Sequence, residues 1–208
     1  MNISTQHFEN LPHRKELQKI CKAISVLDAI LMQEWQYRYY SYNSKWSVGE
    51  EFFEMRDGVG NHLLILFKKE GCVINGTHSD IKFPNIEIVT KHLPKHFHEF
   101  IFGQPVKSQG TNFCIWTNEN EKWETQIKDK NDGSEELLFI FDGNPETYRE
   151  WAKNYYENDN IDLAIIKKIY DDEIVTKNIA TSLNEEIDFE QLKNDLIEIN
   201  YPYDFTDR

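Results

Sequence analysis

The sequence of 208 residues has few of the features that build disulfide frameworks, thiolate metal sites or membrane spans. Its three cysteines, Cys21, Cys72 and Cys114, lie far apart and form no C-x-x-C pair, so we expect neither structural disulfides nor a thiolate zinc site. The longest apolar runs, such as residues 63–67, are too short to cross a bilayer. The first residues lack a basic stretch followed by an apolar run, so we expect no secretory signal and a cytoplasmic location.

Common catalytic and cofactor signatures are also missing. The sequence contains no G-x-S-x-G nucleophile turn, no G-K-[ST] phosphate loop and no H-E-x-x-H zinc motif. The densest histidine group is His92, His96 and His98, but His96 and His98 are two residues apart on a predicted helix and therefore point to opposite sides. We expect no metal ion and no cofactor.

Aromatic residues are plentiful by contrast. The chain has 5 Trp, 10 Tyr and 13 Phe, and large rings bury enough apolar area to support a sizeable core. No Pro-, Gly- or Ser-rich linker divides the chain. One α+β domain over residues 1–208 is predicted, β-rich over 1–130 and helical and acidic over 131–208.

Hydrophobic periodicity gives the order of elements. Apolar residues at helical spacing predict a helix over 12–33, and two hairpins are predicted over 62–75 and 112–127. After Gly133 the chain turns helical, with helix starts predicted at the capping residues Asn144, Thr176 and Asp188. The expected architecture is a mixed or antiparallel sheet of about five strands packed by helices, with a helical C-terminal layer.

The densest aromatic segment, residues 35–42, alternates in a way that predicts a strand. One face carries Arg38, Tyr40 and Tyr42, a composition that is favoured at protein interfaces. We therefore name these three residues as candidate binding residues. The alternative is that helices cover both faces of the strand.

The segment 47–60 predicts a short helix that ends at a turn. Ser47-Val48-Gly49-Glu50 matches a capping box, and Gly58 is placed to end the helix. The following G-x-G lacks the strand, loop and helix order of a phosphate-binding loop. If the chain is an enzyme, four residues near the predicted hairpin ends are candidates for its site: Arg56, Asp57, His62 and His78.

The net charge of −13 is concentrated at one end. Residues 1–118 contain 12 acidic and 13 basic side chains, whereas residues 119–208 contain 24 acidic and 10 basic ones. An acidic surface repels nucleic acid and anionic lipid, and it attracts a basic protein. The alternative is a solvated surface that only maintains solubility.

Several segments resemble a family of uncharacterised bacterial proteins. They are 34–46, the Met-Arg-Asp-Gly-x-Gly stretch at 55–60, 64–67, 113–116, 137–156 and 200–202. This resemblance implies no established activity and no site residues. Residues 93–100 are similar to the L-P-x-x-[FY]-x-x-F helix of SMI1/KNR4-type (SUKH) immunity proteins, in which that helix lies near the start of the chain. This second resemblance implies that the chain neutralises a toxin.

Two main hypotheses follow. The first is a non-enzymatic protein-interaction module, and more specifically an immunity protein that binds a basic toxin or nuclease but no nucleic acid or membrane. The second is a small enzyme with an unfamiliar site near Arg56 and Asp57. A ligand-sensing or accessory domain is a third possibility.

Overall fold

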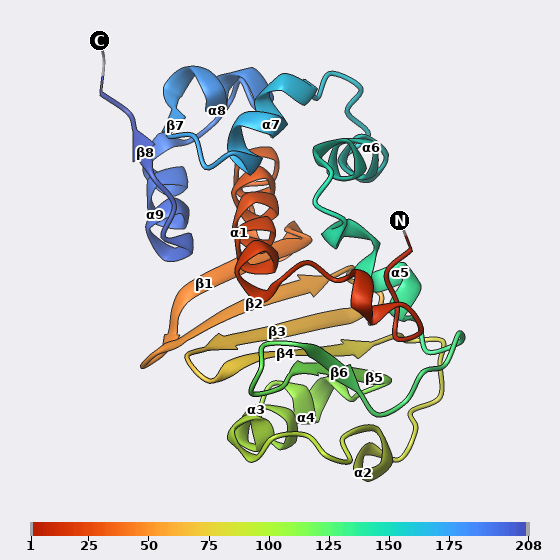
Figure 1. Cartoon of the computed structure of the whole chain (residues 1–208). Coiled ribbons are helices and arrows are strands. Elements are labelled where there is room, and N and C mark those ends of the chain that lie inside the picture. Colours follow the sequence, from red (N-terminus) through yellow and green to blue (C-terminus); the bar gives the residue numbers. More distant parts are fainter. Residues whose placement is uncertain (1, 207–208) are drawn as a thin grey trace.

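A computed structural model describes residues 2–206, in which six strands form one antiparallel sheet (Figure 1). The strands are β1 (Tyr40–Ser47), β2 (Glu50–Arg56), β3 (His62–Lys68), β4 (Gly71–Thr77), β5 (Phe113–Thr117) and β6 (Trp123–Thr125). Each strand pairs with the next one along the chain, which is the arrangement that hairpin connections favour. The α+β class is confirmed, with six strands in place of about five.

Helices cover both faces of this sheet (Figure 1). One face carries the long helix α1 (Arg14–Leu31) and the C-terminal helices, which are α5 (Ser134–Leu138), α6 (Pro145–Tyr155), α7 (Leu163–Tyr170), α8 (Lys177–Leu183) and α9 (Phe189–Ile199). The other face carries three short helices, α2 (Ile86–Val89), α3 (His98–Phe102) and α4 (Val106–Gln109). The predicted helical C-terminal layer is therefore present.

Burial on both faces explains the apolar run in β3. Leu63, Ile65 and Phe67 belong to the core beneath α1, whereas Leu64 and Leu66 belong to a second core beneath α2–α4. A strand that is covered on both sides needs apolar residues at every position. β3 is therefore a central strand of a three-layer arrangement.

The β1 end of the sheet is covered differently on its two faces. Tyr40 and Tyr42 pack into the core beneath α1, whereas their neighbours Ser41 and Asn43 point to the opposite face, on the same side as Glu54 of β2. Polar residues at these positions fit a surface that α2–α4 leave uncovered. The pairing of β1 with β2 is irregular between Asn43 and Ser47, a feature that protects edge strands from pairing with other chains.

Two predicted elements are wrong. Residues Trp35–Tyr37 form a 3₁₀ helix, so the strand begins only at Tyr40. The segment predicted as a helix after Ser47 is strand β2, because Ser47 pairs with Glu50 across a two-residue hairpin turn. Gly49 takes a φ of 75° in that turn, a value that glycine adopts without strain. The Gly58 turn therefore follows a strand and not a helix.

The C-terminal helices begin at the predicted capping residues. The side chains of Asn144, Thr176 and Asp188 accept hydrogen bonds from the first backbone N–H groups of α6, α8 and α9. Each cap satisfies donors that a helix cannot pair internally. A feature that the sequence did not indicate is the short parallel pair of β7 (Val175–Thr176) and β8 (Tyr203–Asp204), which joins the C-terminal segment to this layer.

A buried carboxylate ties α1 to both β1 and α6. Asp28 has no exposed surface, and its Oδ2 accepts a hydrogen bond of 2.8 Å from the Tyr40 N–H. Its Oδ1 accepts one of 2.6 Å from the Tyr148 hydroxyl. Burial, which outweighs these hydrogen bonds, raises the pKa of Asp28 from 3.8 to about 6. Asp28 therefore links α1, β1 and α6, although burial disfavours its charged form.

Candidate functional site

The candidate binding residues Arg38, Tyr40 and Tyr42 are buried, with exposed fractions of 4%, 2% and 3%. The expectation that they form an exposed face is therefore wrong. The strand begins after Arg38, and α1 packs over the side of β1 that carries the two tyrosines. Tyr40 belongs to the core, whereas Arg38 and Tyr42 line the wall of a cavity beside them.

Arg38 joins the start of β1 to helix α9. Its Nη1 and Nη2 donate to the two carboxylate oxygens of Asp195 at 3.0 and 2.7 Å. Its remaining donors bind the carbonyl oxygens of Met32 and Gln33 at 2.8 and 3.1 Å. A bidentate pair of this kind is strong and directional. Arg38 thus joins these segments inside the protein, and four of its five N–H donors are in use.

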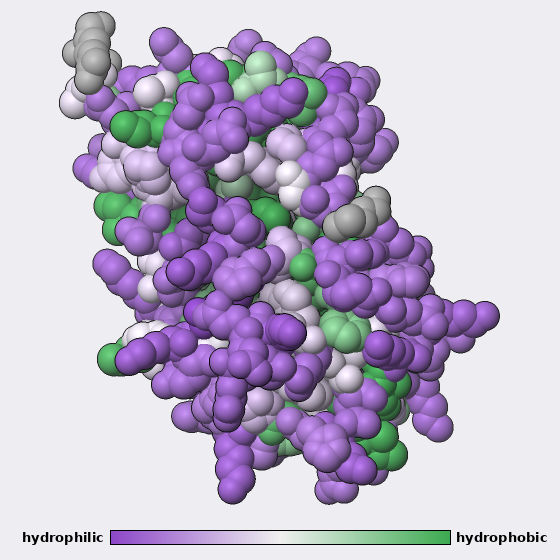
Figure 2. Space-filling model, viewed as in Figure 1, coloured by the Kyte–Doolittle hydropathy of each residue, from purple (hydrophilic) through white to green (hydrophobic). Residues whose placement is uncertain are grey.

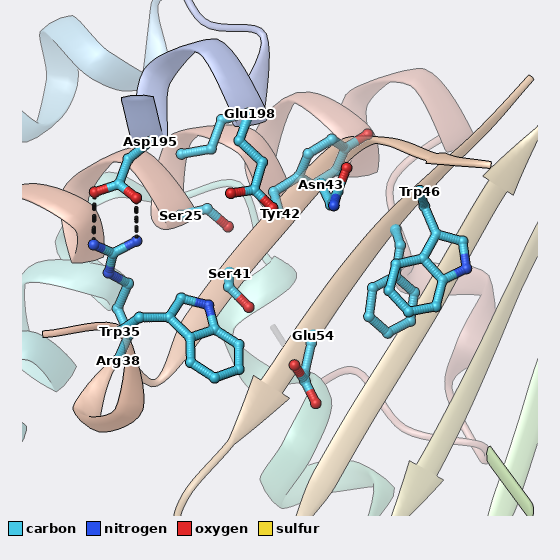
Figure 3. A pocket seen from close by; sticks show the side chains of 12 residues that line it. Ser25, Trp35, Arg38, Ser41, Tyr42, Asn43, Trp46, Glu54, Asp195 and Glu198 are labelled. Carbon is cyan, nitrogen blue, oxygen red and sulfur yellow. Dashed lines mark hydrogen bonds and ion pairs between the residues drawn. The ribbon is translucent and has the colours of Figure 1, made fainter. Parts of the chain in front are cut away.

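The cavity beside Arg38, called the edge groove here, has a volume of about 360 Å³. It lies along β1 and β2 and is closed on one side by α9, as Figure 3 shows. Trp35 and Trp46 stand at its two ends, and both are substantially exposed, at 55% and 43%. The polar residues between them that line the groove include Ser25, Ser41, Asn43, Glu54 and Glu198.

The two glutamates make the edge groove acidic. Glu54 enters from β2 and Glu198 from α9, so they approach from opposite sides (Figure 3). The nearest cation to the Glu54 carboxylate is Arg56 Nη1 at 3.9 Å. Glu198 has no ion pair through its carboxylate among residues 2–206. Burial raises the pKa of both residues, and the neighbouring Asp195 raises that of Glu198 further. The groove holds negative charge that the protein does not fully compensate.

A second cavity, called the turn cavity here, lies around the Asp57–Asn61 turn between β2 and β3. Its volume is about 420 Å³. It brings together three of the four candidate enzyme residues, Arg56, Asp57 and His62, and adds Tyr37 and Tyr155. Residues that sequence reasoning placed near one hairpin therefore do share a cavity.

Two of these groups are already engaged. The Asp57 carboxylate accepts hydrogen bonds from Val59 N–H, Asn61 N–H and Asn61 Nδ2 at 2.9, 3.0 and 2.5 Å. The Arg56 guanidinium lies 3.5 Å from the centre of the Trp35 ring, and its Nη2 donates to the Trp35 carbonyl oxygen at 2.5 Å. Asp57 thus shapes the turn, and Arg56 fixes the 3₁₀ helix against β2.

The two histidines do not act together. His62 lies in the turn cavity, where burial lowers its pKa, and its Nδ1 has no hydrogen-bond partner in the described part of the chain. His78 lies just after β4, and its Nε2 is 3.2 Å from the Glu136 carboxylate. His78 does not line the turn cavity. The one His–carboxylate pair among these candidates, His78 with Glu136, therefore lies outside the turn cavity.

The acidic C-terminal layer keeps most of its surface polar (Figure 2). Cations of the first 118 residues form ion pairs with three carboxylates of the last 90: Arg14 with Glu121, Lys19 with Asp172, and Arg38 with Asp195. The last 90 residues contain 24 acidic side chains, so these three pairs leave their charge largely uncancelled.

Three residues of the edge groove escaped sequence reasoning, namely Trp46, Glu54 and Glu198. Glu54 lies in a segment that was predicted as a helix, where its side of the sheet could not be assigned. Glu198 comes into place only because α9 packs beside β1, where Ser44 Oγ donates to the Glu198 carbonyl oxygen at 2.6 Å. A contact between residues so distant in sequence leaves no local signal.

A scan against protein-family models found no match, and searches of curated proteins and of solved structures found none either. Within residues 2–206, no group of three or more His, Cys, Asp or Glu side chains is arranged to hold a metal ion. No helix in that range has the length and hydrophobicity that a membrane span requires.

Proposed function

We propose that this chain is a non-enzymatic protein-interaction module that binds a basic protein through the edge groove and the acidic surface around it. The observation that carries the proposal is the pair of glutamates, half-buried Glu54 and exposed Glu198, between the exposed rings of Trp35 and Trp46. Burial raises the pKa of both carboxyl groups, which means that it disfavours their charged form, and a basic partner that supplies a further cation offsets that cost. Exposed tryptophans are typical anchors at interfaces.

The charge of the whole chain supports the same proposal. A net charge of −13, with the excess in the last 90 residues, accelerates encounter with a basic partner and makes binding sensitive to salt. The same field disfavours nucleic acid as a partner. Charge therefore favours a protein ligand of opposite sign.

In its finer form the proposal is a cytoplasmic bacterial immunity protein whose basic partner is a toxin or a nuclease. The thiols of Cys21, Cys72 and Cys114 are free and buried, which suits a reducing compartment. Occlusion of a basic active surface needs a rigid acidic face but no catalytic group. The turn cavity carries no competing proposal, because Arg56 and Asp57 are engaged with their neighbours.

The test is affinity purification from the native host, followed by titration of the captured protein against the purified chain. We expect a basic partner that forms a complex of fixed stoichiometry and whose affinity falls steeply as salt rises. A partner without net positive charge, or a complex that is insensitive to salt, would contradict the proposal. Inhibition of the partner's own toxicity in cells would support the immunity role, and its absence would remove that finer form.

A further inference from the structure

The floor of the edge groove contains a hydroxyl group without a partner. Ser25 lies on α1 and is only 1% exposed, yet its Oγ forms no hydrogen bond among residues 2–206. The side chain lines the groove, and its hydroxyl points toward it in Figure 3. A buried polar group is almost always paired in a finished structure. The hydroxyl is therefore available to pair with a ligand that enters the groove.

The groove offers acceptors where a ligand must supply donors. The carboxylates of Glu54 and Glu198 can only accept hydrogen bonds when ionised, and the Ser25 hydroxyl can accept as well. Four of the five N–H donors of Arg38 are already used by Asp195 and by backbone carbonyl groups. Positive charge and several N–H donors are thus the complementary chemistry.

The indole rings at the two ends add a preference for a flat cation. Trp35 already stacks on the guanidinium of Arg56, which lies 3.5 Å from its ring centre. Trp46 stacks on Phe52, with ring centroids 4.3 Å apart, so that its indole is held in place. A guanidinium is planar and weakly hydrated, and it stacks on aromatic rings more readily than an ammonium group.

We propose that the edge groove binds one arginine side chain of the partner, with its guanidinium beside Glu198 and within reach of Ser25, while Glu54 contributes negative charge from the opposite side of the groove. This inference rests on the function proposed above and names the residue that anchors the partner. A planar group with five N–H donors can bond one carboxylate through two parallel hydrogen bonds and a hydroxyl through a third. A lysine supplies the same charge with fewer and less directional donors.

The test compares three fluorescein-labelled peptides by fluorescence anisotropy at low salt. Each peptide has two lysines before and two lysines after a central residue. The central residue is arginine, lysine or citrulline. Citrulline keeps the shape of arginine and removes its charge. We expect the full chain to bind the arginine peptide about tenfold more tightly than the citrulline peptide, the ratio that one charge-assisted hydrogen bond supplies, and the lysine peptide to lie between them.

Variants locate the effect. Glu198→Gln should remove most of the preference for arginine, Glu54→Gln should remove a smaller part of it, and Ser25→Ala should reduce it while leaving the affinity for the lysine peptide unchanged. Glu190→Gln is the matched control, because Glu190 is an exposed residue of the same helix, α9, and does not line the groove. It should lower all three affinities slightly and keep the preference. Circular dichroism would establish that each variant is folded.

The outcomes separate this inference from the proposed function. Equal affinities for the three peptides, with salt-sensitive binding, would overturn the arginine anchor and leave the basic-partner proposal standing. Loss of the preference in Glu190→Gln to the same extent as in Glu198→Gln would overturn the anchor as well. Failure of the full chain to bind any of the peptides at low salt would overturn both.

Discussion

The edge groove and the turn cavity both border Arg38, and they differ in how their charges are compensated. In the turn cavity, Asp57 accepts three hydrogen bonds from its own turn, and Arg56 is held by Trp35. In the edge groove, Glu198 forms no ion pair in the described part of the chain, because the nearby Arg38 is already paired with Asp195, and the cation of Glu54 is 3.9 Å away. Charged residues in a cavity thus indicate a ligand only where the protein itself supplies too few hydrogen bonds or opposite charges to satisfy them.

The largest effect on stability is expected when Arg38, which lines both cavities, is replaced. Arg38→Met should lower the free energy of unfolding by about 3–5 kcal/mol, because Asp195 would lose its cation in a largely buried position. Arg56→Met, on the more exposed side, should cost about 1 kcal/mol. Urea denaturation of both variants provides the measurement. Equal losses would show that the two arginines are not distinguished by burial.

The buried carboxylate of Asp28 provides a third case for this comparison of charge compensation. Like Asp57, it accepts hydrogen bonds from the protein. Unlike Glu54, it is completely buried. Its pKa is about 6 in the folded chain and 3.8 ordinarily, so folding favours the protonated form. The stability that this preference contributes is complete well below pH 3.8 and is lost as the pH rises through 6. The loss amounts to about 3 kcal/mol.

The matched variant is Asp28→Asn, which does not titrate and keeps an oxygen to accept from the Tyr40 N–H. Between pH 4 and pH 7, the wild-type chain should lose about 2 kcal/mol of stability relative to this variant, because the unfolded chain is already largely ionised at pH 4. Urea denaturation of both chains at the two pH values measures the difference. Parallel pH dependences of the two chains would mean that Asp28 does not titrate in this range.

A smaller test compares the acids of the two cavities directly. Asp57→Ala should destabilise the chain by about 1–3 kcal/mol, because three donors of the turn lose their acceptor. Glu198→Gln should leave the stability unchanged or raise it by a few tenths of a kcal/mol, since solvent screens its half-exposed carboxylate. Thermal unfolding of both variants checks this contrast. A destabilising Glu198→Gln would indicate a structural role for that residue.

The fold could be predicted largely from the sequence because its signals are local. The period of α1, the caps of Asn144 and Asp188 and the hairpin of β3 and β4 each depend on neighbouring residues. The segment 47–58 misled because Ser47-Val48-Gly49-Glu50 fits a capping box and a two-residue hairpin turn equally well. Phe52 and Phe53 enter opposite cores, which removes the alternation that marks a strand.

The candidate site could be predicted only in part. Arg56, Asp57 and His62 were grouped correctly because β2 and β3 are joined by a short turn. Glu198 could not be placed beside Glu54, because their approach depends on the packing of α9 against β1. Arg38 and Tyr42 were assigned to an exposed face because the sequence does not reveal which side of an edge strand a distant helix covers.

The most direct measurement of the central claim is a titration of the chain with the arginine peptide, followed through the indole N–H resonances of its five tryptophans. The resonances of Trp35 and Trp46, at the ends of the groove, should shift with peptide concentration. Trp116 is buried on β5, and the indole N–H of Trp123 donates to the Pro12 carbonyl oxygen, so their resonances should remain in place. Shifts confined to other tryptophans, or none at saturating peptide, would contradict the account.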